Sequence, residues 1–193
     1  MKAGIRAVLT VFSLCCLLAF TLIVIWLQKV QAADDAYDWR LQFMSELALG
    51  TSGGWMLTAF LFLALSCLGF AFSLHGFSRA CHRFLLVTFS VAAGSFLGAG
   101  LVSLRDHAMM HILFVLLAFS FLLAGMWGVF RVLSDLRLRL GTALAFAVIV
   151  IALLMVDGQL LAPGTGQRLV AAGCLGWMAY VLVVMNPPPV KVS

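Results

Sequence analysis

A few ionisable residues interrupt an otherwise apolar sequence, and two of them have the spacing of metal ligands. His107 and His111 are four residues apart, so on one continuous helix their imidazoles share a face. Asp106 or Asp157 could supply a third ligand, and Glu46 could act as a general base on a metal-bound water. This pattern predicts, as one alternative, a metal-dependent lipid hydrolase or transferase.

A simpler interpretation of the same two histidines is structural. His107 is then a loop residue, and His111 forms a hydrogen bond with a neighbouring helix. We favour this interpretation, because the HxxxH pattern alone is a weak signal. The chain has no Gly-rich phosphate loop, serine nucleophile motif or HExxH motif, so no motif identifies a reaction or a cofactor.

The composition places these residues in a membrane protein. The chain has 193 residues, of which 64% are hydrophobic and 10% are charged, whereas soluble domains have about 25% charged residues. So few charges cannot cover a water-facing surface, but a lipid-facing surface needs none. A soluble globule is excluded, and any chemistry must lie inside or at the edge of a helix bundle.

Six apolar segments are long enough, or nearly so, to cross about 30 Å of hydrocarbon as helices. The predicted spans cover residues 7–27, 54–74, 84–104, 108–130, 141–161 and 169–185. The apolar runs are continuous and do not alternate with period two, which excludes a closed β-barrel. We therefore predict an all-α fold, a single transmembrane domain of six helices over residues 1–193.

The basic residues set the predicted orientation. With the N-terminus inside, the cytoplasmic segments hold Lys2, Arg6, Arg79, Arg83, Arg131, Arg137, Arg139 and Lys191. The outer segments hold only Lys29, Arg40, Arg105 and Arg168. Both termini are therefore predicted to be cytoplasmic. The net charge of +5 then indicates attraction to membrane lipids of the inner leaflet, and no nucleic-acid partner is predicted, because no basic segment outside the membrane carries interleaved aromatic residues.

The N-terminal segment also resembles a secretory signal. Lys2 and Arg6 precede an apolar run, and Val30-Gln31-Ala32 forms a small-residue cleavage site. The run from Ala7 to Leu27 is, however, longer than the roughly 7–15 residues of a usual signal. We therefore predict a retained first helix and keep cleavage as the alternative.

Polar residues gather at the predicted outer ends of the spans. We expect them to converge into a polar cap or ligand-binding site formed by Ser45, Glu46, Asp106, His111, Asp157 and Arg168. The reason is energetic, since a charge near hydrocarbon is costly unless a partner offsets it. Arg168 could pair with a carboxylate or with a lipid phosphate.

Small residues recur at helical spacing inside the spans. Ser90, Gly94 and Gly98 follow one another every four residues, and Ala124 and Gly128 do the same in the next span. Such residues let helix backbones approach closely. They predict helix contacts within the bundle, and they would also suit docking of a small subunit to a larger membrane complex.

Three short motifs resemble those of a known family. Residues 43–50 (Phe-Met-Ser-Glu-Leu-Ala-Leu-Gly) resemble the I-S-E-L-G element of the six-helix bacterial and archaeal integral membrane family catalogued as domain of unknown function 998. The other two motifs are Asp106 with His111 and Leu117-Ala118-Phe119, and Gly166-Gln167-Arg168-Leu169, which resembles a G-x-x-x-R-L helix opening. The chain has Leu104-Arg105 where that family commonly has a Pro before the outer Asp.

The resemblance implies a multi-pass protein of the cytoplasmic (inner) membrane of a bacterium or archaeon. The family is distantly similar to the Frag1, DRAM and Sfk1 group, which is linked to lipid and membrane homeostasis. We therefore predict a noncatalytic lipid-interacting or accessory membrane protein. The outer-face metal-dependent lipid enzyme and the small subunit of a larger membrane complex are the alternatives.

Overall fold

The computed structural model describes residues 3–33, 37–74 and 79–185, and this part of the chain contains helices and no strand. The helices are α1 (Ala3–Ala33), the short 3-10 helix η1 (Met44–Leu49), α2 (Gly54–Ser73), α3 (Arg79–Leu101), α4 (Ala108–Val132), α5 (Leu136–Asp157) and α6 (Pro163–Met185). Within the described residues, six helices are long and apolar enough to cross a membrane. The predicted all-α fold with six spans is confirmed.

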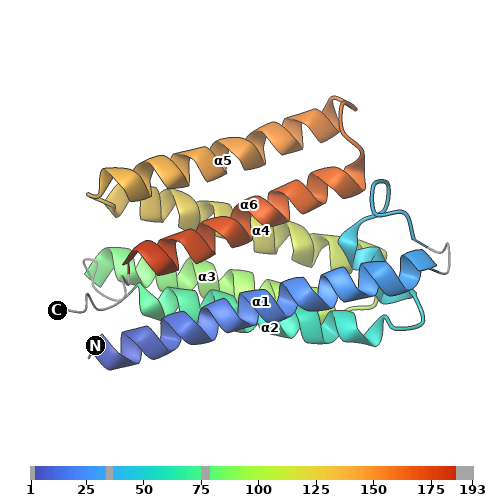
Figure 1. Ribbon diagram of the computed structural model, residues 1–193, viewed down its shortest axis with the longest axis horizontal. Helices are drawn as coiled ribbons and strands as arrows, with labels where there is room; N and C mark the ends of the chain where they lie inside the picture. The colour runs from blue at the N-terminus through green and yellow to red at the C-terminus, as the bar shows by residue number, and fades with distance from the viewer. Residues whose placement is uncertain (1–2, 34–36, 75–78, 186–193) are drawn as a thin grey trace, which may run out of the picture.

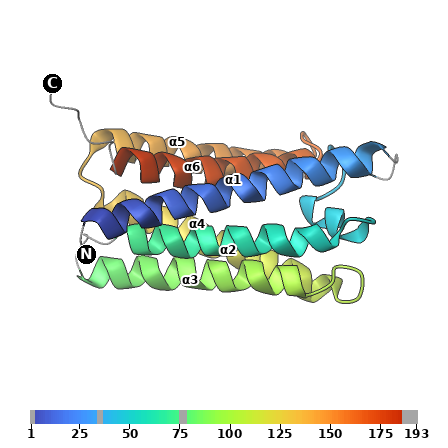
Figure 2. The ribbon, with the colours of Figure 1, turned by 60° about the horizontal axis from the view of Figure 1, so that its bottom comes forward.

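The six long helices run side by side, and α1 begins at the end of the bundle where α6 ends (Figure 1). We call this the basic end; it also holds the turn of residues 133–135. The opposite end, which we call the cap end, holds the connections 38–53, 102–107 and 158–162. Figure 2 shows α1, α2 and α3 as successive rows, with α5 and α6 beyond α1. Helix α5 contacts mainly α6.

Local sequence explains where the last two helices begin. The Asp135 side chain accepts hydrogen bonds from the backbone N–H groups of Arg137 (2.7 Å) and Leu138 (3.4 Å), as an N-cap residue does. Helix α6 begins at Pro163, whose fixed φ suits the first helical position. It therefore starts about 1.7 turns before the apolar run that predicted the sixth span, and this extra length carries Arg168 into the helix.

Glycines of α3 and α4 face phenylalanines of the other helix. A Cβ atom added at Gly98 would lie 2.7 Å from the ring of Phe114, and one added at Gly125 would lie 2.7 Å from the ring of Phe89. The helix contact predicted at Gly98 is therefore made by glycine against an aromatic ring. The prediction is wrong for Gly94, which is exposed and has open space around it. Gly94 therefore makes no close helix contact, although it precedes Gly98 by one four-residue step.

Candidate functional site

Arg168, near the start of α6, is the centre of the polar layer at the cap end. Its Nη1 atom donates to the backbone oxygens of Gln42 (3.0 Å) and Gly164 (2.8 Å), and its Nη2 atom donates to the Tyr37 hydroxyl. The Gln28 amide, oriented by its hydrogen bonds, accepts from Nε and Nη2 at 3.1 Å each. A guanidinium has five N–H donors. All five are bonded to acceptors of the chain itself, and every acceptor is neutral.

Tyr37 lies directly beneath this guanidinium. Its side chain is only 6% exposed, and the Arg168 Cζ atom lies 5.6 Å from the centre of its ring. The phenol donates to the backbone oxygen of Phe43 at 3.1 Å. Burial raises the pKa of the Tyr37 phenol, although the adjacent Arg168 works in the opposite direction. The phenol is thus held in its neutral, donating form.

Two glutamines and a glutamate fasten η1 to the helices around it. The Glu46 carboxylate accepts from the backbone N–H of Phe43 at 2.8 Å. Gln31 of α1 donates to the backbone oxygen of Leu47 at 2.7 Å, and the Gln167 side chain of α6 accepts from the Met44 N–H at 2.6 Å. We call the interacting set the cap cluster: Gln28, Gln31, Tyr37, Gln42, Glu46, Gln167 and Arg168. It ties the first and last helices to the connection between α1 and α2.

The structure places the predicted cap residues in different surroundings. Glu46 and Arg168 belong to the cap cluster, and Ser45 is buried directly beneath it. Asp106 and Asp157 are exposed and do not join them. Asp106 lies in the turn after α3, where Ser103 bonds the backbone, and Asp157 is the last residue of α5, which packs mainly on α6. Position at a span end therefore did not bring these two carboxylates to Arg168.

The two histidines do not share a face. His107 is exposed and precedes α4 with a non-helical φ of −138°, so the four-residue spacing does not act as helical spacing here. His111 is 2% exposed, its Nδ1 atom lies 3.1 Å from the Val102 oxygen, and its ring meets the edge of Phe60. Among the described residues, no three His, Cys, Asp or Glu side chains are grouped closely enough to hold one metal ion.

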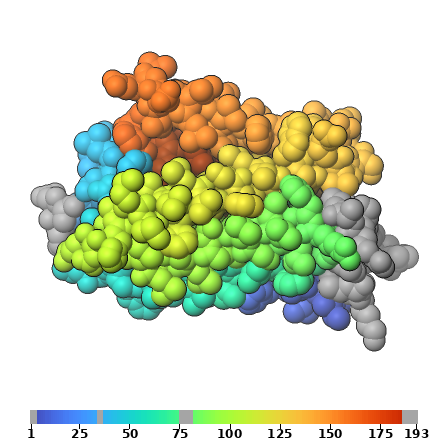
Figure 3. Space-filling model, turned by 180° about the vertical axis from the view of Figure 1, so that it is seen from behind, coloured from blue at the N-terminus to red at the C-terminus, as the bar shows by residue number. Residues whose placement is uncertain are grey.

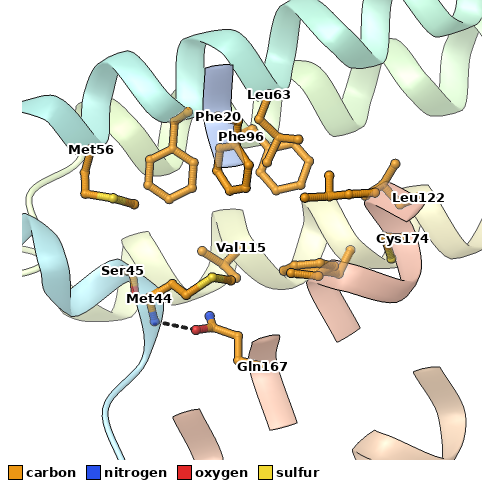
Figure 4. Close-up of a pocket in the computed structure, with 14 residues that line it drawn as sticks. Phe20, Met44, Ser45, Met56, Leu63, Phe96, Val115, Leu122, Gln167 and Cys174 are labelled. Atoms are coloured by element: carbon orange, nitrogen blue, oxygen red, sulfur yellow. Dashed lines mark hydrogen bonds between the residues drawn. The ribbon is translucent and has the colours of Figure 1, made fainter. Parts of the chain in front are cut away.

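A small apolar cavity lies beneath the cap cluster (Figure 4). Its volume is about 30 Å³, and its walls include Phe20, Met56, Phe60, Phe96 and Leu122. Ser45 and Gln167 provide its polar rim. A cavity of this volume can hold a water molecule, but it cannot hold a larger ligand unless side chains move.

A larger hollow lies between α4 and α5, on the face shown in Figure 3. This lateral groove has a volume of about 340 Å³. Its walls are Met126, Trp127 and Phe130 from α4, and Ala143, Phe146 and Ala147 from α5, with three further α5 residues at its margins. Trp127 is 52% exposed, so the groove opens on the outside of the bundle, toward lipid.

Sequence reasoning missed most of the cap cluster and the lateral groove. Gln28 and Gln31 end an apolar run at a three-residue spacing, which places two amides on one helix face. Ala143 and Ala147 show the four-residue spacing that was noticed in other spans. Both patterns are visible in the sequence, but neither indicates which distant segment of the chain packs against these residues.

Comparison with known proteins gives this chain no named relative. No protein-family model, no curated protein and no solved structure matches it.

Proposed function

We propose that this multi-pass membrane protein is noncatalytic and interacts with lipid through its lateral groove. The groove carries the proposal, because its volume of about 340 Å³ falls within the usual range of ligand pockets, roughly 300–1,000 Å³. Its one hydroxyl belongs to Thr142, which already donates to the Leu138 oxygen (2.7 Å) and accepts from the indole N–H of Trp177 (2.9 Å). An apolar chain is the ligand that such walls suit.

The bonding of the cap cluster supports a noncatalytic role for the cap end. A phosphate clamp needs guanidinium N–H groups that face the ligand, and those of Arg168 are bonded within the chain. The Glu46 carboxylate accepts from the Phe43 N–H (2.8 Å) and from the Gln42 amide (3.3 Å). The charged groups of Arg168 and Glu46 therefore hold segments of the protein together by hydrogen bonds.

The metal-dependent lipid enzyme has less support than the noncatalytic function. It needs both imidazoles turned inward together with a third ligand. His107 faces solvent, whereas His111 is enclosed between α4 and α2 and directs Nδ1 at a backbone oxygen. The exposed Asp106 and Asp157 do not approach the buried imidazole as ligands within the described residues.

The location and family of the protein are parts of the same proposal. The cap end faces outward in the orientation that the basic residues predict, and both termini are then cytoplasmic. From the resemblance to the six-helix family we infer that the membrane is the inner membrane of a bacterium or archaeon. Glu46 and Arg168, which carry part of that resemblance, both lie in the cap cluster.

The groove can be tested by filling it. Ala147→Phe puts a ring into the groove, and Leu144→Phe is its control, because Leu144 lies on the same helix, is exposed and does not line the groove. We expect purified Ala147→Phe protein to retain about one phospholipid fewer per chain than the wild type, as counted by native mass spectrometry. Leu144→Phe should retain the wild-type number.

Two results would contradict the proposal. Equal lipid retention by both variants would mean that the groove is not a lipid site. Metal-dependent cleavage of a phospholipid by the purified protein, lost in His111→Ala but not in Ala147→Phe, would favour the enzyme instead.

A further inference from the structure

The mouth of the lateral groove at the basic end is framed by two arginines, each lying over an aromatic ring of α4. The Arg131 Cζ atom lies 6.0 Å from the ring centre of Trp127, and the Arg139 Cζ atom lies 5.2 Å from that of Phe130. These two rings are stacked on each other at 5.6 Å and both form the wall of the groove. The cation–π contacts with these rings hold the two guanidiniums beside the end of the lateral groove.

The described part of the chain does not neutralise the charges of these arginines. Both side chains are exposed, and no carboxylate of residues 3–33, 37–74 and 79–185 forms an ion pair with either one. Asp135, the acidic residue of the same turn, accepts from the first backbone N–H groups of α5. Arg137 adds a third exposed positive charge nearby. The groove therefore ends at a surface of net positive charge.

We propose that the groove and its two arginines bind one anionic phospholipid. One acyl chain lies along Ala143 and Ala147, and the phosphate accepts hydrogen bonds from Arg131 and Arg139. This deepens the proposed function, on which it rests, by naming the class of lipid. Guanidinium groups match phosphate oxygens in geometry and charge, and a zwitterionic lipid lacks the net charge that they attract.

The shape and charge of the site favour a lipid over another helix. The groove has apolar walls, and the exposed Trp127 shows that it opens on the outside of the bundle, where acyl chains surround the protein. Its positive mouth complements the negative surface of the cytoplasmic leaflet, which is where the predicted orientation puts it. A partner helix or a second copy of the chain would have to supply both an apolar ridge and a matching acidic residue.

Quenching of Trp127 by brominated lipid tests the inference on the full chain. The protein is placed in phosphatidylcholine nanodiscs that contain brominated phosphatidylglycerol or brominated phosphatidylcholine, and the signal of Trp127 is obtained by subtracting that of Trp127→Phe. Each arginine near an anionic surface adds about five-fold in affinity, so we expect a preference for phosphatidylglycerol of about 25-fold.

Matched variants separate the headgroup from the acyl chain. The double variant Arg131→Gln with Arg139→Gln should reduce the preference to about one while still being quenched by both lipids. Arg40→Gln is the control: this exposed arginine also lies over a ring, 5.4 Å from the centre of Trp39, but at the cap end. It should keep the full preference.

The possible failures are distinguishable. The anionic inference would be overturned if the wild type showed no lipid preference, or if the double variant kept the preference for phosphatidylglycerol. In either case, a drop in quenching by both lipids in Ala147→Phe would still support the proposed function. If Ala147→Phe changes neither quenching, the proposed function fails as well. A second copy or a co-purified helix that shields Trp127 from both lipids would overturn both.

Discussion

The two ends of the bundle use arginine in opposite ways. At the cap end, Arg168 is half-buried and bonds five times within the chain, above a cavity of about 30 Å³. At the basic end, Arg131 and Arg139 are exposed without ion partners in the described chain, beside a groove of about 340 Å³. We therefore expect a charge near hydrocarbon to bind a ligand only where its hydrogen-bonding groups are not already bonded within the protein.

Removing Arg168 is the strongest test of this contrast. Arg168→Ala leaves the acceptors on Gln28, Tyr37 and Gln42 without their donor. We expect a loss of stability on the order of 3 kcal/mol, measured by unfolding in detergent. Arg168→Lys should recover only a small part, because an ammonium cannot reproduce the planar fork. Arg139→Ala should change stability by less than about 0.5 kcal/mol. Equal losses of stability for Arg139→Ala and Arg168→Ala would mean that the two ends of the bundle do not use arginine differently.

A second comparison concerns two aspartates at opposite ends of α5. Asp135 bonds the first N–H groups of that helix, so Asp135→Ala should cost about 1 kcal/mol in unfolding free energy. Asp157 is exposed at the other end, and its side chain has no hydrogen bond in the described structure. Asp157→Ala should stay within about 0.5 kcal/mol of the wild type. A larger loss of stability for Asp157→Ala than for Asp135→Ala would mean that Asp157 is paired at the cap end.

The phenol of Tyr37 should give the smallest effect, a dependence of stability on alkaline pH. Because burial raises the pKa of Tyr37 in the folded protein, its contribution is complete below the unfolded value of about 10 and is lost as pH rises through the folded value. The difference in Tm between wild type and Tyr37→Phe should therefore narrow above about pH 10. A difference that stays constant up to pH 11 would mean that folding does not raise the pKa of Tyr37.

The sequence predicted the fold better than the sites, for a physical reason. A continuous apolar run such as residues 54–74 determines a membrane helix by itself, because the backbone must satisfy its own hydrogen bonds in lipid. The cap cluster instead depends on which neutral groups lie opposite Arg168, and Gln28 is 140 positions away in the chain. Arg168 and Glu46 could be predicted because a charge near hydrocarbon is unusual. Their uncharged hydrogen-bond partners have no comparable pattern in the sequence.

The lateral groove was beyond prediction for a different reason. Helix α5 is apolar around most of its circumference, so its sequence does not indicate which face is left uncovered. The hollow exists because α5 packs on α6 and approaches α4 only weakly. The arginines at its mouth were visible in the sequence, where they indicated orientation and attraction to inner-leaflet lipids, but the sequence did not indicate that a groove lies beside them.

The cap cluster also has a consequence for the order in which the protein is made. Gln28 and Gln31 belong to the first of the six described long helices in chain order, whereas Gln167 and Arg168 belong to the sixth. Until α6 has been inserted, the Met44 N–H lacks its Gln167 acceptor and the Tyr37 hydroxyl lacks its Arg168 donor. The cap can thus close only after α6 has been made and inserted, and we expect a chain stalled after α5 to leave this segment open to proteolysis.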